Sequence, residues 1–271
     1  MVANTELDRV DLKGWRTGLP NMLRKESRPW WASCRQFLRS LLWTIAVNGV
    51  VLLVMFVLVP AAEKVAGAAG LPRLERLATG TDTLFKIGLL ALAFRTIVLV
   101  QDEILGERQL GVTEWLLSKP LARSAYVLAK LLANSLGVLV ILVGLQGVVG
   151  WGALSLIKGE PFPLPPYLAA MAGTAVHTLF YLALTLMMGV LTSSRRSLLG
   201  ASLGFLLAGV LLAGFLGKGV LATPWGMSAA VTGAALGMAL PIPVWVPICV
   251  TAALSAAFVA VALVRFERLE F

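Results

Sequence analysis

The residues of this chain whose types and spacing suit binding chemistry lie in the connection 101–125, between two apolar runs. This connection combines acidic side chains at Glu103, Glu107 and Glu114 with three adjacent apolar side chains at 115–117. An apolar patch surrounded by charge on a water-exposed segment is typical of a surface that binds a partner. The alternative interpretation is a short helix that lies on lipid headgroups.

Within this connection we predict a short helix that begins at Thr113 and ends before Pro120. Threonine is a favoured N-cap residue, and a proline disfavours helical geometry at the residue before it. Trp115 is expected to be the main contact residue, because large aromatic side chains dominate the binding energy of interfaces. Glu107 and Glu114 are expected to set the orientation of the partner.

The connection resembles the cytoplasmic loop of ABC transporter permeases of the type-2 exporter family. The family pattern is an acidic–basic pair, Gly-Thr, an acidic residue, Leu-Leu, a proline, and an arginine before a lysine. This chain departs from it at Val112, which separates the glycine from the threonine. The corresponding residues, in order, are Glu107, Arg108, Gly111, Thr113, Glu114, Leu116, Leu117, Pro120, Arg123 and Lys130.

The resemblance implies that the loop contains a coupling helix that contacts a separate ATPase subunit. It also implies two permease chains, identical or homologous, and two ATPase copies that bind ATP and Mg²⁺. We expect no cofactor in this chain, because its Gly217-Lys218 pair is followed by glycine and does not complete a phosphate-binding loop. By this resemblance, the residues that contact the ATPase are Glu103, Glu107, Gly111, Thr113, Glu114, Trp115, Leu116, Leu117, Pro120 and Arg123.

The composition indicates a membrane protein. Apolar residues make up 58% of the 271 residues, charged residues make up 14%, and the mean hydropathy is +0.86. Six apolar runs are each about long enough to cross a bilayer as a helix, so we predict an all-α protein with six transmembrane helices. A cytoplasmic segment 1–40 would precede a permease domain 41–271. The runs cover 41–60, 84–100, 126–145, 167–191, 198–216 and 246–264.

The basic residues predict the orientation of these spans. Lysine and arginine are concentrated on the side that holds both termini, which places the termini in the cytoplasm of a multi-pass inner-membrane protein. The net charge of +9 therefore reflects topology. We expect no nucleic-acid partner, because the cations form no stripe with interleaved aromatic residues. The two cysteines and one histidine also form no zinc-binding pattern.

Two segments outside the spans are predicted to form short helices. After Pro29, apolar residues recur at helical spacing over 30–41 beside several arginines, which predicts an amphipathic helix in the membrane interface. On the opposite side of the membrane, the apolar stretch 227–240 is too short to cross. It predicts a re-entrant or interfacial helix.

Few polar side chains fall within the predicted spans. Arg95 is expected to extend to the membrane interface or to pair with Glu103 or Glu107. His177 either lines a substrate pathway or forms a hydrogen bond between helices.

A row of small residues lies in the fifth predicted span. Gly200, Gly204 and Ala208 recur every four residues, which allows another helix to approach closely and predicts a dimer interface. The same region matches G-x-S-x-G around Ser202, but that motif needs a strand-to-helix turn rather than the interior of an apolar helix.

Three functions are therefore considered. The leading hypothesis is the permease subunit of an ATP-driven exporter, which is not itself an enzyme. A secondary transporter or channel would need acidic residues or broken helices near the bilayer midplane, and the six runs contain no Asp or Glu. An intramembrane serine hydrolase that uses Ser202 and His177 is the third hypothesis.

Overall fold

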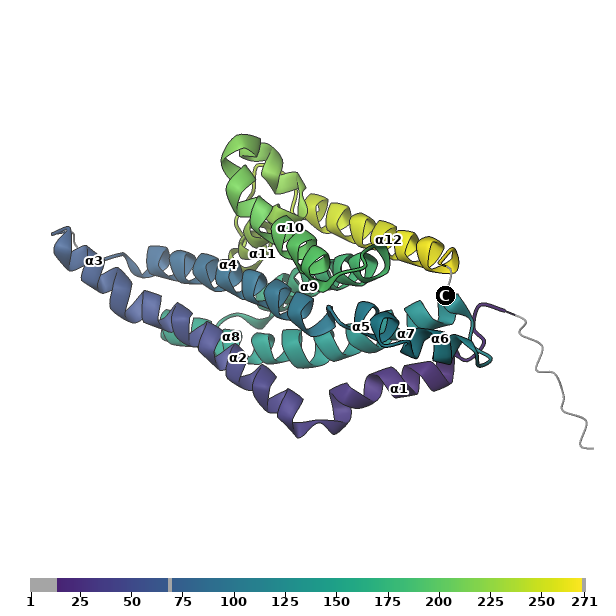
Figure 1. Cartoon of the computed structure of the whole chain (residues 1–271). Helices are drawn as coiled ribbons and strands as arrows, with labels where there is room; N and C mark the ends of the chain where they lie inside the picture. Colours follow the sequence, from purple (N-terminus) through teal and green to yellow (C-terminus); the bar gives the residue numbers. More distant parts are fainter. Residues whose placement is uncertain (1–13, 68–69, 270–271) are drawn as a thin grey trace, which may run out of the picture.

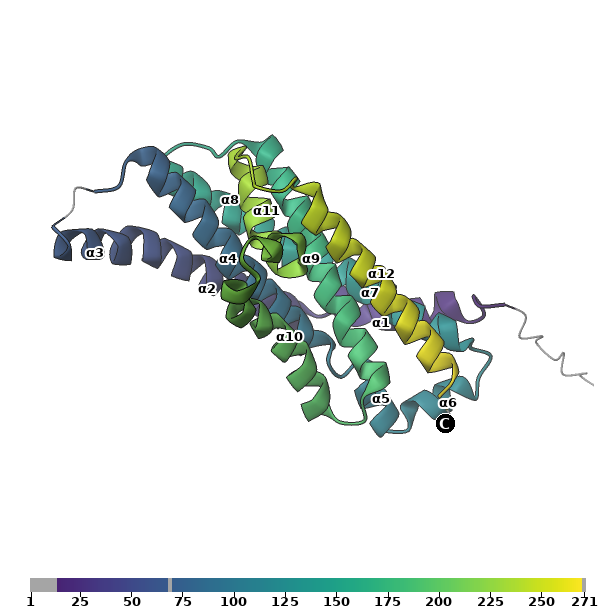
Figure 2. The same cartoon turned by 90° about the horizontal axis from the view of Figure 1, so that it is seen from above.

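The computed structural model describes residues 14–67 and 70–269, and all regular structure within these ranges is helical. The helices form an elongated bundle (Figures 1 and 2). Two short helices, α5 (Leu105–Gln109) and α6 (Val112–Leu117), lie at one end of this bundle, which we call the loop end. The short helix α3 (Val59–Val65) extends from the opposite end.

Five helical segments are long and apolar enough to cross a membrane, namely Cys34–Val65, Arg73–Gln109, Arg123–Lys158, Leu164–Leu191 and Trp245–Glu267. Each contains one of the predicted runs and extends beyond it at one or both ends. The remaining predicted run corresponds to α10 (Arg195–Leu216), an apolar helix of 22 residues.

Three of the five segments are single rods or rods with one irregular turn. The first is α4 (Arg73–Val100), which continues into α5. The second is α9 (Leu164–Leu191), and the third is α12 (Trp245–Glu267). The other two each contain a π-helical turn. One joins α2 (Cys34–Leu53), η1 (Val54–Leu58) and α3, and the other joins α7 (Arg123–Gly137), η2 (Val138–Val143) and α8 (Gly144–Lys158).

The N-terminal region forms a helical elbow, and the prediction of one continuous interface helix over 30–41 is wrong. Helix α1 (Leu19–Ala32) includes Pro29 and ends before Ser33, which has extended backbone geometry. The Ser33 hydroxyl accepts a hydrogen bond of 3.2 Å from the Gln36 amide and so caps α2. The chain therefore turns at Ser33, as Figure 1 shows between α1 and α2.

The face of α1 that carries Trp30 packs against protein rather than against lipid headgroups. The Trp30 indole is buried, and its Nε1 donates a hydrogen bond of 3.0 Å to Asn134 Oδ1 on α7. Gly137, one turn further along α7, lies directly against the indole ring, so any side chain there would collide with it. Helix α1 is thus fixed to α7 by one bulky residue that fits over a glycine.

The stretch 227–240, for which a short helix was predicted, contains a short buried helix. Two 3₁₀ turns, η3 (Gly217–Ala222) and η4 (Pro224–Gly226), lead into α11 (Met227–Leu236). Helix α11 ends at Gly237, whose φ of +65° is strained for residues other than glycine. Its Met227 and Val231 are buried in the apolar core with residues of α4 and α9.

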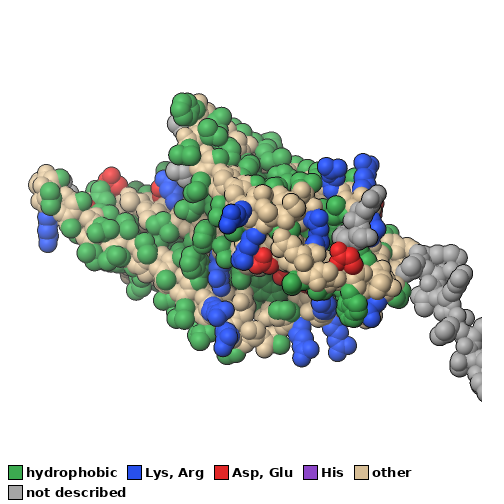
Figure 3. Space-filling model, in the orientation of Figure 1, with side chains coloured by type: hydrophobic (Ala, Val, Ile, Leu, Met, Phe, Trp, Pro, Cys, Tyr) green, Lys and Arg blue, Asp and Glu red, His purple; other side chains and the backbone are tan. Residues whose placement is uncertain are grey.

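The apolar core consists of two main clusters along the bundle axis. The cluster nearer the loop end contains Tyr126 and Phe266, whose rings stack with centroids 5.0 Å apart. The second cluster joins α4, α8, α9 and α11 around Leu84 and Met227. Outside these clusters, large apolar side chains cover much of the outer surface, as expected where the solvent is lipid (Figure 3).

Candidate coupling surface

Helix α6 is set at an angle to its neighbour by a glycine. Gly111 has a φ of +69° and precedes α6 as its N-cap residue, without a side-chain cap. This left-handed geometry costs glycine little, whereas other residues are strained there. The prediction that Thr113 caps the helix is therefore wrong. Thr113 is buried inside α6, and its hydroxyl lies 3.3 Å from the hydroxyl of Tyr126.

The three adjacent apolar residues at 115–117 point in different directions. Trp115 is 60% exposed, while Leu116 and Leu117 are partly buried against the core at the loop end. The Lys119 ammonium lies 4.3 Å from the centre of the Trp115 ring, a distance that allows a cation–π contact. The exposed patch is thus a single aromatic side chain with a cation over its ring.

A second exposed apolar side chain, which sequence reasoning did not select, lies in the same loop. Leu110, at the turn between α5 and α6, is 79% exposed. Glu114 and Pro120 are also exposed. We call the exposed residues Leu110, Glu114, Trp115, Lys119 and Pro120 the Trp115 surface.

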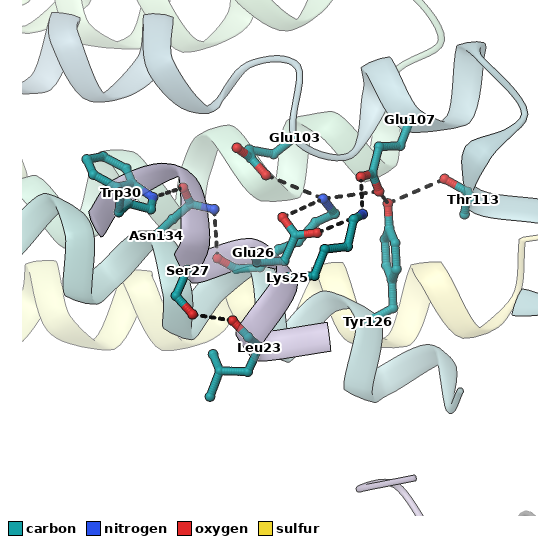
Figure 4. Close-up of polar contacts among 11 residues, drawn as sticks. Leu23, Lys25, Glu26, Ser27, Trp30, Glu103, Glu107, Thr113, Tyr126 and Asn134 are labelled. Atoms are coloured by element: carbon teal, nitrogen blue, oxygen red, sulfur yellow. Dashed lines mark hydrogen bonds and ion pairs between the residues drawn. The ribbon is translucent and has the colours of Figure 1, made fainter. Parts of the chain in front are cut away.

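The inner side of the loop is held by a buried charge cluster around Lys130 of α7. Lys130 is 1% exposed, and its ammonium lies 3.1 Å from a carboxylate oxygen of Glu26 and 3.1 Å from one of Glu107. Glu103 lies 3.3 Å away. The three carboxylates come from α1, from the turn after α4 and from α5, so one ammonium joins three segments to α7 (Figure 4).

A second lysine completes the cluster. The Lys25 ammonium lies 2.8 Å from Glu107 and 3.1 Å from Glu26. Burial lowers the pKa of Lys25, but the hydrogen bond to Glu107 and the charge of Glu26 outweigh this effect, so the pKa is raised above its ordinary value. The Tyr126 hydroxyl donates a further hydrogen bond of 2.7 Å to Glu107.

Two arginines attach the loop region to the ends of two long helices. Arg108 donates hydrogen bonds of 3.0 to 3.3 Å to the carbonyl oxygens of Gly189, Val190 and Thr192, where α9 ends. Arg123 donates hydrogen bonds of 2.7 Å to carbonyl oxygens at the end of α12. The last carbonyls of a helix lack intrahelical partners and carry partial negative charge, so a guanidinium satisfies and stabilises them.

The predicted contact residues therefore fall into two groups. The exposed group comprises Gly111, Glu114, Trp115 and Pro120. The second group makes internal contacts and comprises Glu103, Glu107, Thr113, Leu116, Leu117 and Arg123. Sequence reasoning did not select Lys25 and Glu26. The available signal was that Glu26 is the one acidic residue in an otherwise basic stretch, 24–39.

Arg95 does not make the predicted pairing with Glu103 or Glu107, because both carboxylates bind Lys130 instead. His177 is buried in α9 and forms an edge-to-face contact with Tyr181, with ring centroids 5.0 Å apart.

The small-residue row of α10 is open on its outer side. A Cβ atom added to Gly200 or Gly204 would meet no atom within 4 Å, and Ala208 is partly exposed. Ser202 faces the other way and is buried inside the same helix. The helical geometry at Ser202 differs from the strand-to-helix turn that presents a catalytic serine in G-x-S-x-G enzymes.

These features define the class of protein: a multi-pass helical membrane protein with a structured loop attached to the ends of its spans. The family model for ABC-2 family transporter proteins matches residues 24–271, nearly the whole chain. The chain belongs to this family and is a transporter membrane subunit without catalytic activity of its own. Membership in this family implies an ATPase partner subunit. No curated protein matches the chain.

The buried cluster predicts a large effect of Lys130→Met. This substitution would leave Glu26 and Glu107 with Lys25 alone and would remove the Lys130 partner of Glu103, so we expect the free energy of unfolding to fall by about 3–5 kcal/mol. Thermal unfolding in detergent, followed by circular dichroism, measures the change.

A matched control is Lys86→Met, because Lys86 pairs with Asp82 at 2.6 Å on an exposed surface. Such pairs contribute about 0–1 kcal/mol. Adding Glu103→Gln to Lys130→Met should restore part of the loss. Equal destabilisation by the two lysine substitutions would contradict the assignment of Lys130 as the structural centre of the loop.

Proposed function

We propose that this chain is the membrane-spanning permease subunit of an ATP-driven exporter, and that its Trp115 surface binds a separate ATPase subunit. The ATPase would bind ATP and Mg²⁺, and the assembly would contain two ATPase copies. The observation that carries the proposal is the exposed Trp115 on α6, whose buried Thr113 lies against Tyr126 of α7 and whose neighbour α5 is attached to α7 and to the end of α9. An exposed aromatic anchor on a rigid support is suited to binding a partner with little loss of conformational entropy.

The attachments of the loop support a mechanical role for this contact. The Lys130 cluster joins the loop to α1 and α7, and Arg108 joins it to the end of α9. A partner that moves α6 would therefore exert force on several spans together. If the loop were attached only through its own backbone, the same displacement would bend the loop and would not move the spans.

The proposal predicts that Trp115→Ala weakens binding of the ATPase subunit that co-purifies with the wild-type chain. Truncation of an aromatic anchor typically costs about 2 kcal/mol or more, which corresponds to roughly a 30-fold rise in Kd. Titration of the two purified subunits measures this change. Insertion and stability should be unchanged, because the Trp115 side chain is mainly exposed.

The control is Trp245→Ala at the opposite end of the bundle, where α12 begins. Trp245 is 64% exposed, closely similar to Trp115, so the two substitutions remove comparable exposed area. We expect Trp245→Ala to leave ATPase binding unchanged. Wild-type affinity in Trp115→Ala would refute the assignment and would favour a contact of α6 with lipid headgroups.

We further propose six spans, with α10 as the fifth, and cytoplasmic termini in an inner-membrane protein. The support is the length of α10 together with the charge distribution. Arg108, Lys119 and Arg123 lie in or directly after the loop, and Arg195 binds Gln101 at its start, on the side that holds the end of α12. The short segment α11 would then lie re-entrant on the outer side.

Cysteine accessibility tests this topology. In a chain whose two native cysteines are replaced, a cysteine at Ala66 or Ala239 should react with a membrane-impermeant maleimide added to intact cells. A cysteine at Ser118 or Ser193 should react only after the membrane is opened. All four positions are exposed, so burial does not limit the reaction. Labelling of Ser118→Cys in intact cells would overturn the orientation.

We also propose that a second permease chain, identical or homologous, packs against the small-residue row of α10. The open outer side of Gly200 and Gly204 supports this proposal, because it lets another helix approach closely. Gly204→Leu should lower the dimer fraction in mild detergent by several-fold, as measured by light scattering or cross-linking.

Gly152→Leu is the control, because Gly152 in α8 also has open space around its Cβ position. At neither position does an added Cβ meet another atom of the same protomer within 4 Å, so a difference between the two variants reports on association. If both variants give the same dimer fraction, the interface lies elsewhere.

A further inference from the structure

A cleft of about 490 Å³ lies between α4, α9, α10 and the segment that contains η3, η4 and α11. Its walls are mainly apolar and include Leu89, Leu90, Leu206 and Trp225. This volume falls in the range of about 300–1,000 Å³ that is typical of small-molecule sites. The Trp115 surface, at the loop end, contributes no residue to this cleft.

Two buried polar groups of α9 line this cleft without a hydrogen-bond partner. Nδ1 of His177 and the hydroxyl of Tyr181 are both inaccessible and unpaired within the described residues. A buried polar group without a partner costs about 1–3 kcal/mol. The two residues are four positions apart and therefore lie on the same face of α9.

Neighbouring polar residues of the same helix show that α9 satisfies its other hydroxyls. Thr174, Thr178 and Thr185 each donate a hydrogen bond of 2.7 to 3.1 Å to the carbonyl four residues earlier. Within α9, the buried polar atoms without a partner thus belong to the two residues that line the cleft, although hydroxyls of Thr96, Ser202 and Thr232 on other helices are also unpaired. Rotation of either side chain would turn its polar atom toward the cleft, where a bound molecule with a hydrogen-bonding group would provide the missing partner.

The walls of the cleft are preformed. The Trp225 indole donates a hydrogen bond of 3.0 Å to the carbonyl of Phe205, and its ring lies directly against Gly209. At the exposed edge, the Lys86 ammonium is already paired with Asp82. The other residues that line the cleft are uncharged, so the cleft favours a neutral ligand over an ionic one.

We propose that this cleft binds a small, neutral, largely aromatic or aliphatic molecule that carries one hydroxyl group, which His177 and Tyr181 recognise. The proposal rests on the proposed function in one respect, because such a molecule would be cargo of the exporter. The hydroxyl can donate to an imidazole nitrogen or accept from a phenol, so a single group satisfies either residue.

The experiment compares two probes, 1-naphthol and 1-methylnaphthalene, with the purified permease in lipid nanodiscs without any ATPase. Equilibrium dialysis against empty nanodiscs subtracts partition into lipid. Wild type should bind 1-naphthol saturably and more tightly than 1-methylnaphthalene. His177→Leu and Tyr181→Phe should each weaken 1-naphthol binding by about 5- to 10-fold, the net value of one hydrogen bond, and leave 1-methylnaphthalene unaffected.

Two further variants separate occupation of the cleft from general effects. Ala229→Phe places a ring in the cleft and should abolish binding of both probes, because Ala229 lines it. Ala253→Phe adds the same ring to an exposed position of α12 and should change neither affinity. Absence of saturable binding, or equal binding by Ala229→Phe and wild type, would overturn the proposal. Since no ATPase is present, that failure would leave the Trp115 test unaffected.

Discussion

The arrangement of the loop end depends on the burial of one ammonium group. Lys130 lies on a helix that is otherwise suited to an apolar environment, and a buried cation without partners is too costly to retain. Its partners must come from elsewhere, and they come from α1, the end of α4 and α5. The positions of these three segments are therefore consequences of neutralising one charge, rather than of apolar packing alone.

This constraint divides the loop into an inner and an outer side. The inner carboxylates and arginines bind protein groups, either charges or the last carbonyls of helices. The Trp115 surface lies on the outer side, and the contact between Lys119 and the Trp115 ring leaves most of the indole accessible. Because the inner side is rigid, the loop loses little conformational entropy when the outer patch binds a partner. A small patch can therefore act as a defined docking surface.

The sequence predicted the long helices well, because apolar run length and charge are local properties. It also placed the start of α6 within one residue and its end within two, although the cap on which the predicted start rested was wrong. It failed where the answer depends on contacts distant in the chain. The sequence predicted that Trp30 lies in the membrane interface, whereas its indole packs on Gly137 of another helix. The cap of α6 was misassigned because Gly111, with its positive φ, outcompetes a threonine side chain.

The loop end and the cleft are linked by the same two helices. Helix α4, which is about 42 Å long, contributes Leu89 and Leu90 to the cleft and ends at the turn that carries Glu103. Helix α9 carries His177 and Tyr181, and its last carbonyls bind Arg108. Any displacement of α5 therefore acts on the ends of both helices that carry the cleft residues. A ligand that favours one spacing of α4 and α9 would favour the matching position of the loop. By linkage, a partner that holds the loop in that position would increase the affinity of the cleft for the ligand equally.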